Sequence, residues 1–399
     1  MTPEIRIGEY HYELPDERIA KFPLVRRDDA RLLTYTGGGV GETVFSALPA
    51  LLPADSLLVF NETKVIPARL HFRRDTGAAI ELFCLDPLQP ADYEQCFASD
   101  SSCIWKCMAG HSKRWKDDPL KRPFGAHVLQ AECIEKHREY LLVRFSWDGG
   151  QSFAQVLEQC GTTPIPPYLK RDALPEDALR YQTVYARYNG SVAAPTAGLH
   201  FTPATLADIA RRGIATATIT LHVGAGTFRP VKSDAIAEHV MHEEPFTVTR
   251  AALQSLLSHV GRTIAVGTTS ARTLESLYFL GQQYLDGKTP QPVSQWEAQT
   301  IACTAAPAEA LQALCRYMDS RHISVLHAAT RLLIAPPYRF KIVRGLLTNF
   351  HQPRSTLLLL VAALIGDRWR AVYDYAMQHD FRFLSYGDSS LLMGVEEAS

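Results

Sequence analysis

The residues from Thr202 to His222 place the strongest constraint on how this chain can fold. TPATLADIARRG has a threonine suited to a helix N-cap, a proline in the first turn and a terminal Gly213, so it predicts a helix. ATATITLH follows and alternates strictly, with alanine, isoleucine and leucine on one face and threonine and histidine on the other. A capped helix that leads directly into such a strand predicts an α/β unit.

The same order of helix and strand recurs along the second half of the chain. TRAALQSLLSHVG predicts a helix, TIAVG a strand, and SARTLESLYFLGQQYLDG another helix. Nearer the C-terminus, RGLLTNF predicts a strand, STLLLLVAALIG a buried helix and FRFLSYG a final strand, while LLVFN at residues 57–61 supplies an early buried strand. This alternation predicts the α/β fold class.

Residues 66–148 have a different pattern. Short β-like runs such as ARLHFRR, AIELFCL and EYLLVRFSW are separated by polar or proline-containing breaks, and no stretch has convincing helical periodicity. We therefore expect a larger α/β core domain made of residues 1–65 and 149–399. It is interrupted by an inserted small all-β, barrel-like domain at residues 66–148.

Composition and charge limit the classes of function. The chain has 399 residues, 46% of them hydrophobic, so it can bury a large core. Its 41 Lys and Arg balance 42 Asp and Glu, so any nucleic-acid site must be a local patch. The N-terminal residues lack a secretory signal pattern, and the longest apolar run, residues 357–365, is too short to span a bilayer. We expect a soluble cytoplasmic protein.

A metal site is conceivable at CIWKCMAGH, which contains Cys103, Cys107 and His111. Structural zinc sites more often have two residues between paired cysteines, and no second CxxC pair is present. We therefore favour ordinary packed cysteines and expect no metal. The eight cysteines of the chain suit reduced thiols in a reducing compartment.

Hydroxyl groups gather where a predicted strand meets a predicted helix. In AVGTTSARTLES the strand ends at Gly267, and Thr268, Thr269 and Ser270 begin the helix, with Arg272 one turn later. Free backbone N–H groups at a helix start bind anions and carboxylates. Plain capping needs only one hydroxyl, so capping and ligand binding remain equal alternatives here.

The end of the alternating strand is a second candidate. In HVGAGTF, His222 is followed by Gly224 and Gly226, which would let a ligand approach the backbone closely. The motif is not a dinucleotide fingerprint, because GxGxxG is not completed. Taken by themselves, the two glycines are explained by a tight turn. Together with a histidine on the polar face of the strand, they favour a ligand-binding site.

EHVMHEE contains a dense group of residues capable of proton transfer, namely His239, His242, Glu243 and Glu244. The histidines are three residues apart, rather than the four of HExxH, so a zincin site is excluded. A solvated polar turn and a catalytic role remain open alternatives.

For RNA, HSKRWKDDPLKR offers a basic loop around a tryptophan that we expect to be exposed, which suits phosphate contact and base stacking, although a solvated loop is the default. PIPPYLKR adds a weaker candidate. The predicted tRNA-binding residues are Lys113, Arg114, Trp115, Lys116, Lys170 and Arg171.

The ordered motifs resemble one family closely. NETKVIPARL, PIPPYLKR, GSVAAPTAGLHFT, LHVGAGTFRPV, EHVMHEE, AVGTTSARTLES, TNFHQPRSTLLLLVAALIG and FRFLSYGD are similar to motifs of the S-adenosylmethionine:tRNA ribosyltransferase-isomerases of queuosine biosynthesis. The similarity runs from Tyr12 to about Leu392. The stretch between Ser276 and Phe340 departs from the family pattern by being longer than usual.

The resemblance implies an enzyme that transfers the ribosyl part of S-adenosylmethionine to the aminomethyl group of a 7-deazaguanine at the tRNA wobble position. Epoxyqueuosine forms, and adenine and methionine leave. S-adenosylmethionine is thus a consumed co-substrate, with no cofactor expected, and we expect a monomer. The chemistry needs a base for a C5′ hydrogen beside the sulfonium, a donor for adenine and a neutral amine.

These roles are assigned to the candidate residues as hypotheses. His222 is the leading acid/base candidate, followed by Glu243 and His242, with His239 as an alternate. The hydroxyls of residues 268–270 would hold the methionine carboxylate with help from Arg272. The remaining assignments are Gly224 and Gly226 beside adenosine, and Tyr185 and Arg229 at the modified base or an adjacent phosphate.

Two functions from other classes compete with this interpretation. An S-adenosylmethionine-dependent RNA methyltransferase would need a glycine-rich strand-to-helix turn followed by a spaced acid, which the N-terminal region lacks. A non-catalytic tRNA-binding protein would need the basic loop without the histidine and glutamate cluster. Release of adenine separates both from the transferase.

Overall fold

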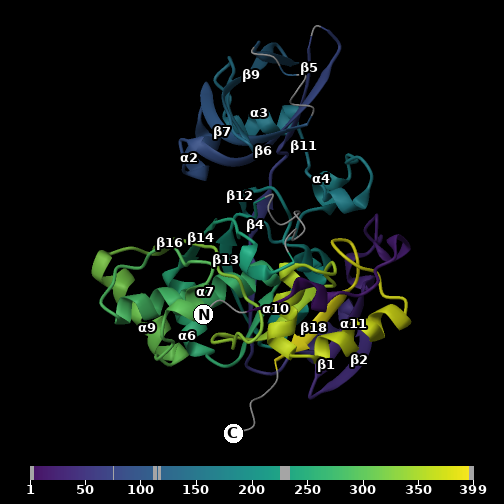
Figure 1. Ribbon diagram of the computed structural model, residues 1–399, viewed down its shortest axis with the longest axis vertical. Helices are drawn as coiled ribbons and strands as arrows, with labels where there is room; N and C mark the ends of the chain where they lie inside the picture. The colour runs from purple at the N-terminus through teal and green to yellow at the C-terminus, as the bar shows by residue number, and fades with distance from the viewer. Residues whose placement is uncertain (1–3, 75, 111–114, 116–117, 225–233, 395–399) are drawn as a thin grey trace.

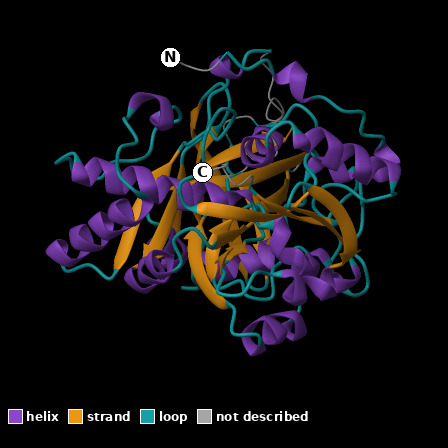
Figure 2. Cartoon of the chain, turned by 90° about the horizontal axis from the view of Figure 1, so that it is seen from below, coloured by secondary structure: helices purple, strands orange, loops and turns teal. Residues whose placement is uncertain are grey.

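The computed structural model describes residues 4–74, 76–110, 115, 118–224 and 234–394. A large body carries a smaller unit above it, and the two are joined through a narrow waist (Figure 1). Seen along the perpendicular direction, the strands are flanked by helices (Figure 2). None of the described helices is long and apolar enough to cross a membrane.

The large body is built on a nine-stranded sheet with a parallel centre. Four neighbouring strands at its centre all run in the same direction, and further strands extend the sheet on both sides through antiparallel pairs. In spatial order the strands are β16 (Val325–Thr330), β14 (Glu244–Thr249), β13 (Ala215–Leu221), β3 (Leu57–Asn61), β15 (Thr263–Val266), β17 (Val343–Asn349), β18 (Ser389–Met393), β1 (Arg31–Thr36) and β2 (Gly39–Val44).

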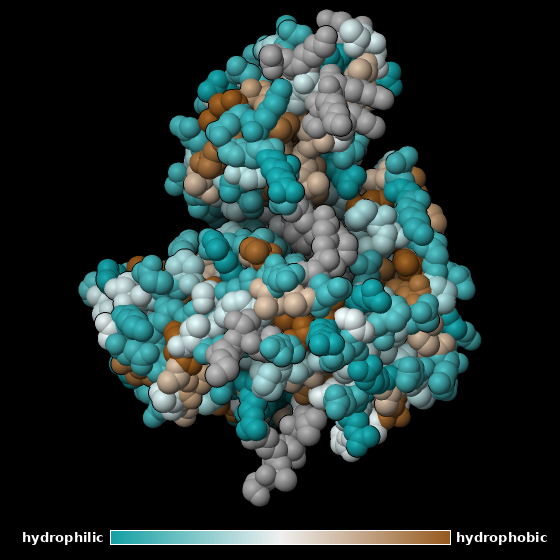
Figure 3. All heavy atoms as spheres, in the orientation of Figure 1, coloured by the Kyte–Doolittle hydropathy of each residue, from teal (hydrophilic) through white to brown (hydrophobic). Residues whose placement is uncertain are grey.

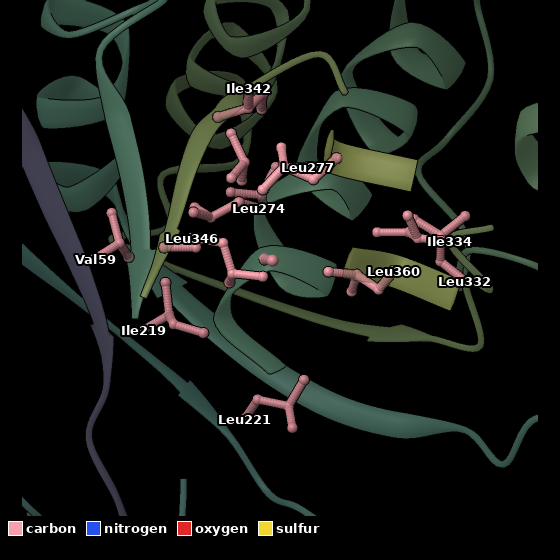
Figure 4. Packing of buried hydrophobic residues seen from close by; sticks show 14 of the residues in the cluster. Val59, Ile219, Leu221, Leu274, Leu277, Leu332, Ile334, Ile342, Leu346 and Leu360 are labelled. Carbon is pink, nitrogen blue, oxygen red and sulfur yellow. The ribbon is translucent and has the colours of Figure 1, made fainter. Parts of the chain in front are cut away.

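Helices cover both faces of this sheet. On one face, Leu274 and Leu277 of α7 (Thr268–Leu285) lie beside Leu346 of β17 in the main core (Figure 4). On the other face, Phe201 and Ile209 pack with Phe60 in a smaller cluster. The helices of the body are α1 (Leu48–Leu51), α4 (Asp177–Arg180), α5 (Pro203–Arg211), α6 (Arg250–Ser258), α7 (Thr268–Leu285), α8 (Glu297–Thr300), α9 (Pro307–Arg321), α10 (Thr356–Ile365) and α11 (Arg368–Gln378).

The local sequence signals explain where these elements begin. The side chain of Thr202 accepts a hydrogen bond from the backbone N–H of Thr205, so it caps α5 as predicted. The alternating strand β13 follows the helix, and it lies between β14 and β3. The predicted α/β fold class is confirmed by this arrangement.

The smaller unit is a curled seven-stranded antiparallel sheet. Arg122 Nη1 of β8 donates to the carbonyl oxygen of His71 in β5 at 2.9 Å, so strands from the two ends of the sheet meet. Its strands in order are β11 (Gly161–Thr162), β5 (Arg69–Arg73), β6 (Ala79–Gln89), β7 (Ser102–Gly110), β10 (Leu141–Ser146), β9 (His127–Lys136) and β8 (Leu120–Phe124). It also carries α2 (Tyr93–Ala98), and β12 (Tyr188–Ser191) pairs with β4 (Thr63–Val65) near the waist.

The interior of the curled sheet contains a separate hydrophobic cluster. Trp105 lies at its centre, and Cys103 and Cys107 are packed beside it. Among the described residues, no group of three or more His, Cys, Asp or Glu could hold a metal ion. His111 lies outside the described residues.

Helix α3 (Phe153–Cys160) differs from its expected place. Its apolar residues, including Phe153 and Val156, belong to the cluster of the curled sheet, although the predicted boundary assigns residues 149–399 to the core domain. The domain boundaries at residues 65 and 148 therefore stay a prediction, with α3 packed on the inserted side.

The expected final strand at FRFLSYG is wrong. Phe381 and Phe383 are buried beside Phe350, and Leu384 has a left-handed φ of 68°. Asp388 accepts the backbone N–H of Arg382, which closes a turn, and the strand begins only at Ser389. Aromatic packing and one isolated β-bridge between Phe383 and Ile19, rather than a continuous strand ladder, thus hold this segment.

Candidate active site

A cavity of about 220 Å³ lies where two parallel strands of the central sheet end. The chain leaves β15 at Gly267 to enter α7, and it leaves β17 through His351 toward α10. Such diverging connections leave a crevice at the carboxyl ends of parallel strands, where ligands bind in many α/β proteins. The walls come chiefly from residues 193–197, 239–242, 267–269, 332–334 and 348–357.

The N-terminus of α7 faces this cavity without a side-chain cap. Gly267 has a φ of 90°, and the first intrahelical bond is donated by the N–H of Ala271. Thr268 and Thr269 line the cavity, and the buried Oγ1 of Thr269 has no hydrogen-bond partner. By contrast, Ser270 donates its hydroxyl to the carbonyl oxygen of Val266 at 2.8 Å, so it does not point into the cavity.

The neighbouring helix N-terminus is closed. In α10 the side chain of Ser355 accepts the N–H of Leu358 at 3.2 Å, which satisfies one of the free donors. The uncapped start of α7 is therefore the better place for a carboxylate or phosphate group.

Glu244 joins two candidate residues in the cavity wall. It begins β14, where strand alternation points it inward with Phe246 and Val248, and it is only 1% exposed. One of its carboxylate oxygens lies 2.8 Å from Nε2 of His242, and the other pairs with a guanidinium nitrogen of Arg272. The prediction favoured Glu243, which pairs instead with Arg331 at 3.1 Å and does not line the cavity.

The contacts of Glu244 with His242 and Arg272 determine the protonation of the histidine and the charge balance of the arginine. A carboxylate only accepts hydrogen bonds, so Nε2 of His242 carries the proton toward Glu244, and Nδ1 is the basic atom of the ring. Arg272 is buried, which lowers its pKa to about 10, and its Nε has no hydrogen-bond partner. Glu244 therefore balances the charge of the buried Arg272.

His239 and His242 both line the cavity, as the grouping in EHVMHEE predicts. Burial and the nearby His242 lower the pKa of His239. The loop is held by Gln295, whose side chain donates to the carbonyl oxygen of His239 at 2.6 Å and accepts the N–H of Met241 at 2.9 Å. A Cβ on Gly224 would lie 3.5 Å from the ring of His242, so this glycine is next to the site.

His351 is a cavity residue that the prediction missed. Its Nε2 lies 3.0 Å from the hydroxyl of Thr348, its backbone N–H bonds to Tyr373, and its carbonyl oxygen accepts the hydroxyl of Tyr12. Burial lowers its pKa to about 3, so its imidazole is neutral near pH 7. TNFHQPRST repeats the strand-then-helix order of AVGTTSAR, and that signal could have found it.

His222, the leading acid/base candidate from the sequence, does not line the cavity, so its catalytic role stays a prediction. The following residue, Val223, lines the cavity, whereas the His222 ring stacks on Tyr93 of α2 at 4.4 Å. Its Nδ1 lies 3.2 Å from the hydroxyl of Thr63, and a Cβ on Gly190 would come within 2.2 Å of it. Burial lowers the His222 pKa to about 4, so it packs as a neutral residue between the two units.

Tyr185 is also outside the cavity wall. Its ring lies between Phe60 and Phe201, and its buried hydroxyl, which has no hydrogen-bond partner, sits against Gly198. The structure therefore gives it a packing role. Gly226 and Arg229 lie outside the described residues, so their assignments stay predictions.

The residues predicted to bind tRNA lie in different surroundings. The expectation that Trp115 is exposed is wrong, because it is 3% exposed and donates Nε1–H to Asp118 at 3.1 Å. Arg171 makes two hydrogen bonds to the buried Asp177, whereas the exposed Lys170 pairs with Asp16 at 2.7 Å. Lys113, Arg114 and Lys116 lie outside the described residues, and their roles stay predictions.

Comparison with known proteins agrees with the resemblance in the motifs. A family model described as queuosine biosynthesis protein matches residues 7–392. The chain belongs to the queuosine biosynthesis protein family. This membership covers nearly all of the chain, including both sheets and every wall of the cavity.

Relatives in this family carry a common name. S-adenosylmethionine:tRNA ribosyltransferase-isomerases from Trichlorobacter lovleyi and Citrifermentans bemidjiense are each 39% identical to this chain, with 97% of the chain and 99% of the relative covered. These two relatives and the family match confirm the expected membership of an enzyme family of queuosine biosynthesis. A crystal structure of S-adenosylmethionine tRNA ribosyltransferase from Thermotoga maritima is 26% identical, with a TM-score of 0.47 and coverage of 96% of this chain and all of that one.

Proposed function

We propose that this enzyme transfers and isomerises the ribosyl group of S-adenosylmethionine onto 7-aminomethyl-7-deazaguanine at the wobble position of tRNA. The products are epoxyqueuosine in the tRNA, adenine and methionine. The names of the relatives support this function. The observation that carries it is the cavity in which an uncapped helix start lies near the Glu244–His242 pair.

The start of α7 is proposed to hold the methionine end of the co-substrate. Its free N–H groups and the unpartnered hydroxyl of Thr269 supply donors for the carboxylate. Arg272 acts mainly by fixing Glu244, because that pair is already neutral. In this proposal, the sulfonium and the adjoining ribose lie over the rest of the cavity.

His242 is proposed as the base that removes a C5′ proton beside the sulfonium. Its Nδ1 accepts the proton, and Glu244 stabilises the imidazolium that results. His351, held neutral by burial, contributes hydrogen bonds to adenine or to the attacking amine without carrying charge. The two histidines thus have different roles because their surroundings differ.

The apolar part of the wall suits the later steps. Five aliphatic residues line the cavity, namely Leu332, Leu333, Ile334, Leu357 and Leu360. Apolar walls exclude water while the epoxide closes, which limits hydrolysis of the reactive intermediate.

The test is to incubate the protein with S-adenosylmethionine and tRNA that carries the aminomethyl deazaguanine. We expect equal release of adenine and methionine, together with a nucleoside heavier by one transferred ribosyl unit. tRNA without the modified base is the control and should release no adenine. Formation of S-adenosylhomocysteine without adenine would instead identify a methyltransferase.

The reaction is proposed to need neither a metal nor a redox cofactor, since proton transfer and displacement suffice for each step. Protein passed through a chelating resin should keep its rate of adenine release. We also propose that it acts as a monomer, which light scattering during size-exclusion chromatography tests directly.

A further inference from the structure

A second, smaller depression lies beside the main cavity. Among the described residues, Arg27, Arg180 and Arg382 line it, and Ser385 belongs to the walls of both. Its volume is about 20 Å³, close to the space of one water molecule, so it cannot take a nucleoside. We call these residues the arginine depression.

Two of the arginines join segments that are far apart in sequence. Arg27 donates Nη2–H to the carbonyl oxygen of Leu179 at 2.8 Å and Nη1–H to that of Gln182 at 2.5 Å. Arg180 donates to the carbonyl oxygens of Val25 and Leu24. Both guanidinium groups are therefore fixed in place beside each other.

The positive charge of this pair is not balanced within the described part of the chain. Neither Arg27 nor Arg180 forms an ion pair there, and Nε of Arg180 is buried without a hydrogen-bond partner. Burial and then the charge of Arg180 lower the pKa of Arg27. The nearby carboxylates have their own partners, in the pairs Asp28–Arg26, Asp177–Arg171 and Asp388–Arg382.

Exposed apolar residues lie beside the two arginines, because the backbone carbonyls of Leu179 and Val25 accept hydrogen bonds from Arg27 and Arg180. Val25 is 93% exposed and Leu179 is 77% exposed, although both are aliphatic. Phe22, which is half exposed, lies against the guanidinium of Arg171 at 4.6 Å. The surface around α4 accordingly shows hydrophobic patches below the upper unit (Figures 1 and 3). Apolar groups beside fixed positive charge suit single-stranded nucleic acid, whose unstacked bases flank each phosphate.

We propose that Arg27 and Arg180 bind a backbone phosphate of the RNA, next to the nucleotide that enters the main cavity. A base that reacts inside a protein cavity must leave its stack, which brings the neighbouring phosphates to the cavity rim. The buried Ser385 lines both hollows, so the arginine depression lies directly beside the main cavity. The inference rests on the proposed function, because it assumes that RNA supplies the nucleotide.

The first test compares steady-state kinetics of the wild type, Arg180→Gln and Arg180→Lys. In Arg180→Gln we expect KM for the modified tRNA to rise roughly tenfold, and the slope of log KM against log salt to fall by about 0.7. KM for S-adenosylmethionine and kcat should not change. Arg180→Lys should keep most of the salt slope, because it keeps the charge.

The matched control is Arg316→Gln on α9, an exposed arginine on the opposite side of the body from α4 (Figure 1). It removes the same charge and should leave KM for the tRNA unchanged. An equal rise in KM for Arg316→Gln and Arg180→Gln would overturn the inference, since it would show a general effect of charge.

A second measurement does not depend on whether Arg180→Gln folds. tRNA ligated from two pieces can carry a neutral methylphosphonate on either side of the modified nucleotide. For the wild type alone, we expect one of the two positions to raise KM roughly tenfold. Where Arg180→Gln folds, the same methylphosphonate should raise its KM no further.

The results separate this inference from the proposed function. If the wild type releases adenine but tolerates both methylphosphonates, the arginine depression does not bind a phosphate, while the proposed function stands. If the wild type releases no adenine from tRNA with a normal backbone, the proposed function fails, and the inference fails with it.

Discussion

A carboxylate oxygen of Glu244 lies 2.8 Å from Nε2 of His242, and only Glu243 separates the two residues in sequence. Strand alternation turns Glu244 into the interior and leaves Glu243 half exposed beside Arg331. The chain thus provides two adjacent glutamates with opposite surroundings, which allows matched experiments.

Replacing Glu244 with glutamine should reduce kcat by about 100-fold or more, because His242 loses the carboxylate that stabilises its protonated form. The change also leaves Arg272 buried without its partner, which costs roughly 3 kcal/mol of unfolding free energy. Single-turnover adenine release and denaturant unfolding measure the two effects. Glu243→Gln is the control and should change neither; equal losses in both variants would contradict the assignment.

Histidine substitutions separate the cavity from the junction between the two units. His242→Gln should lower kcat by at least about 100-fold, since it removes the proposed base. His222→Gln should keep kcat within a fewfold of the wild type, because His222 lies against Tyr93 outside the cavity. A rate of adenine release lost only in His222→Gln would restore His222 as the base.

The hydroxyl of Thr269 should matter more than that of its neighbour. Thr269→Val removes the buried, unpartnered hydroxyl of a residue that lines the cavity, so KM for S-adenosylmethionine should rise about tenfold with no loss of stability. Ser270→Ala removes a hydroxyl bonded within the helix and should leave KM unchanged. If the two variants bind the co-substrate equally well by calorimetry, the carboxylate does not use this hydroxyl.

The free energy of unfolding should decrease as the pH drops below 6.5. Burial lowers the pKa of His200 and His222 to about 4 and that of His351 to about 3, from the ordinary histidine value of 6.5. Between pH 6.5 and these values the unfolded chain binds more protons, so each histidine removes about 2 kcal/mol of unfolding free energy by pH 5. Urea unfolding at pH 7, 6 and 5 measures the slope.

Other groups limit the useful pH window for this test. Burial raises the pKa of Glu275 above its usual 4.5, which acts in the opposite direction near and below pH 5. Measurements should therefore stay above pH 5. His222→Gln should show a shallower slope than the wild type, and identical slopes would mean that this imidazole is not buried in its neutral form.

The helix starts and the strand patterns were predictable because they depend on neighbouring residues. Thr202 caps α5 as expected, and Ala215–Leu221 forms β13. The alternation in EPFTVT also contained the information that selects Glu244, since Phe246 and Val248 share its face. The prediction considered only which residue types occur in EHVMHEE, and it therefore ranked Glu243 as the catalytic glutamate instead.

The face on which the cavity lies was not predictable from one strand. The polar side of β13 ends at His222, but Tyr93 and Gly190, from distant parts of the chain, cover that ring. Other parts of the chain can pack over either face of a central strand. Tertiary packing alone decides which face borders a cavity. The burial of Trp115 has the same cause, because the curled sheet closes around it.

The two hydrogen bonds from Gln295 to the loop that carries His242 have an evolutionary consequence. Gln295 lies 56 residues from His239 in sequence, yet its amide sets the position of that loop. Insertions there can accumulate freely only if they preserve one side chain. Sequence changes around Gln295, far from the reacting groups, can therefore displace the loop that carries His242. A paralogue would then lose activity although all of its catalytic side chains are still present.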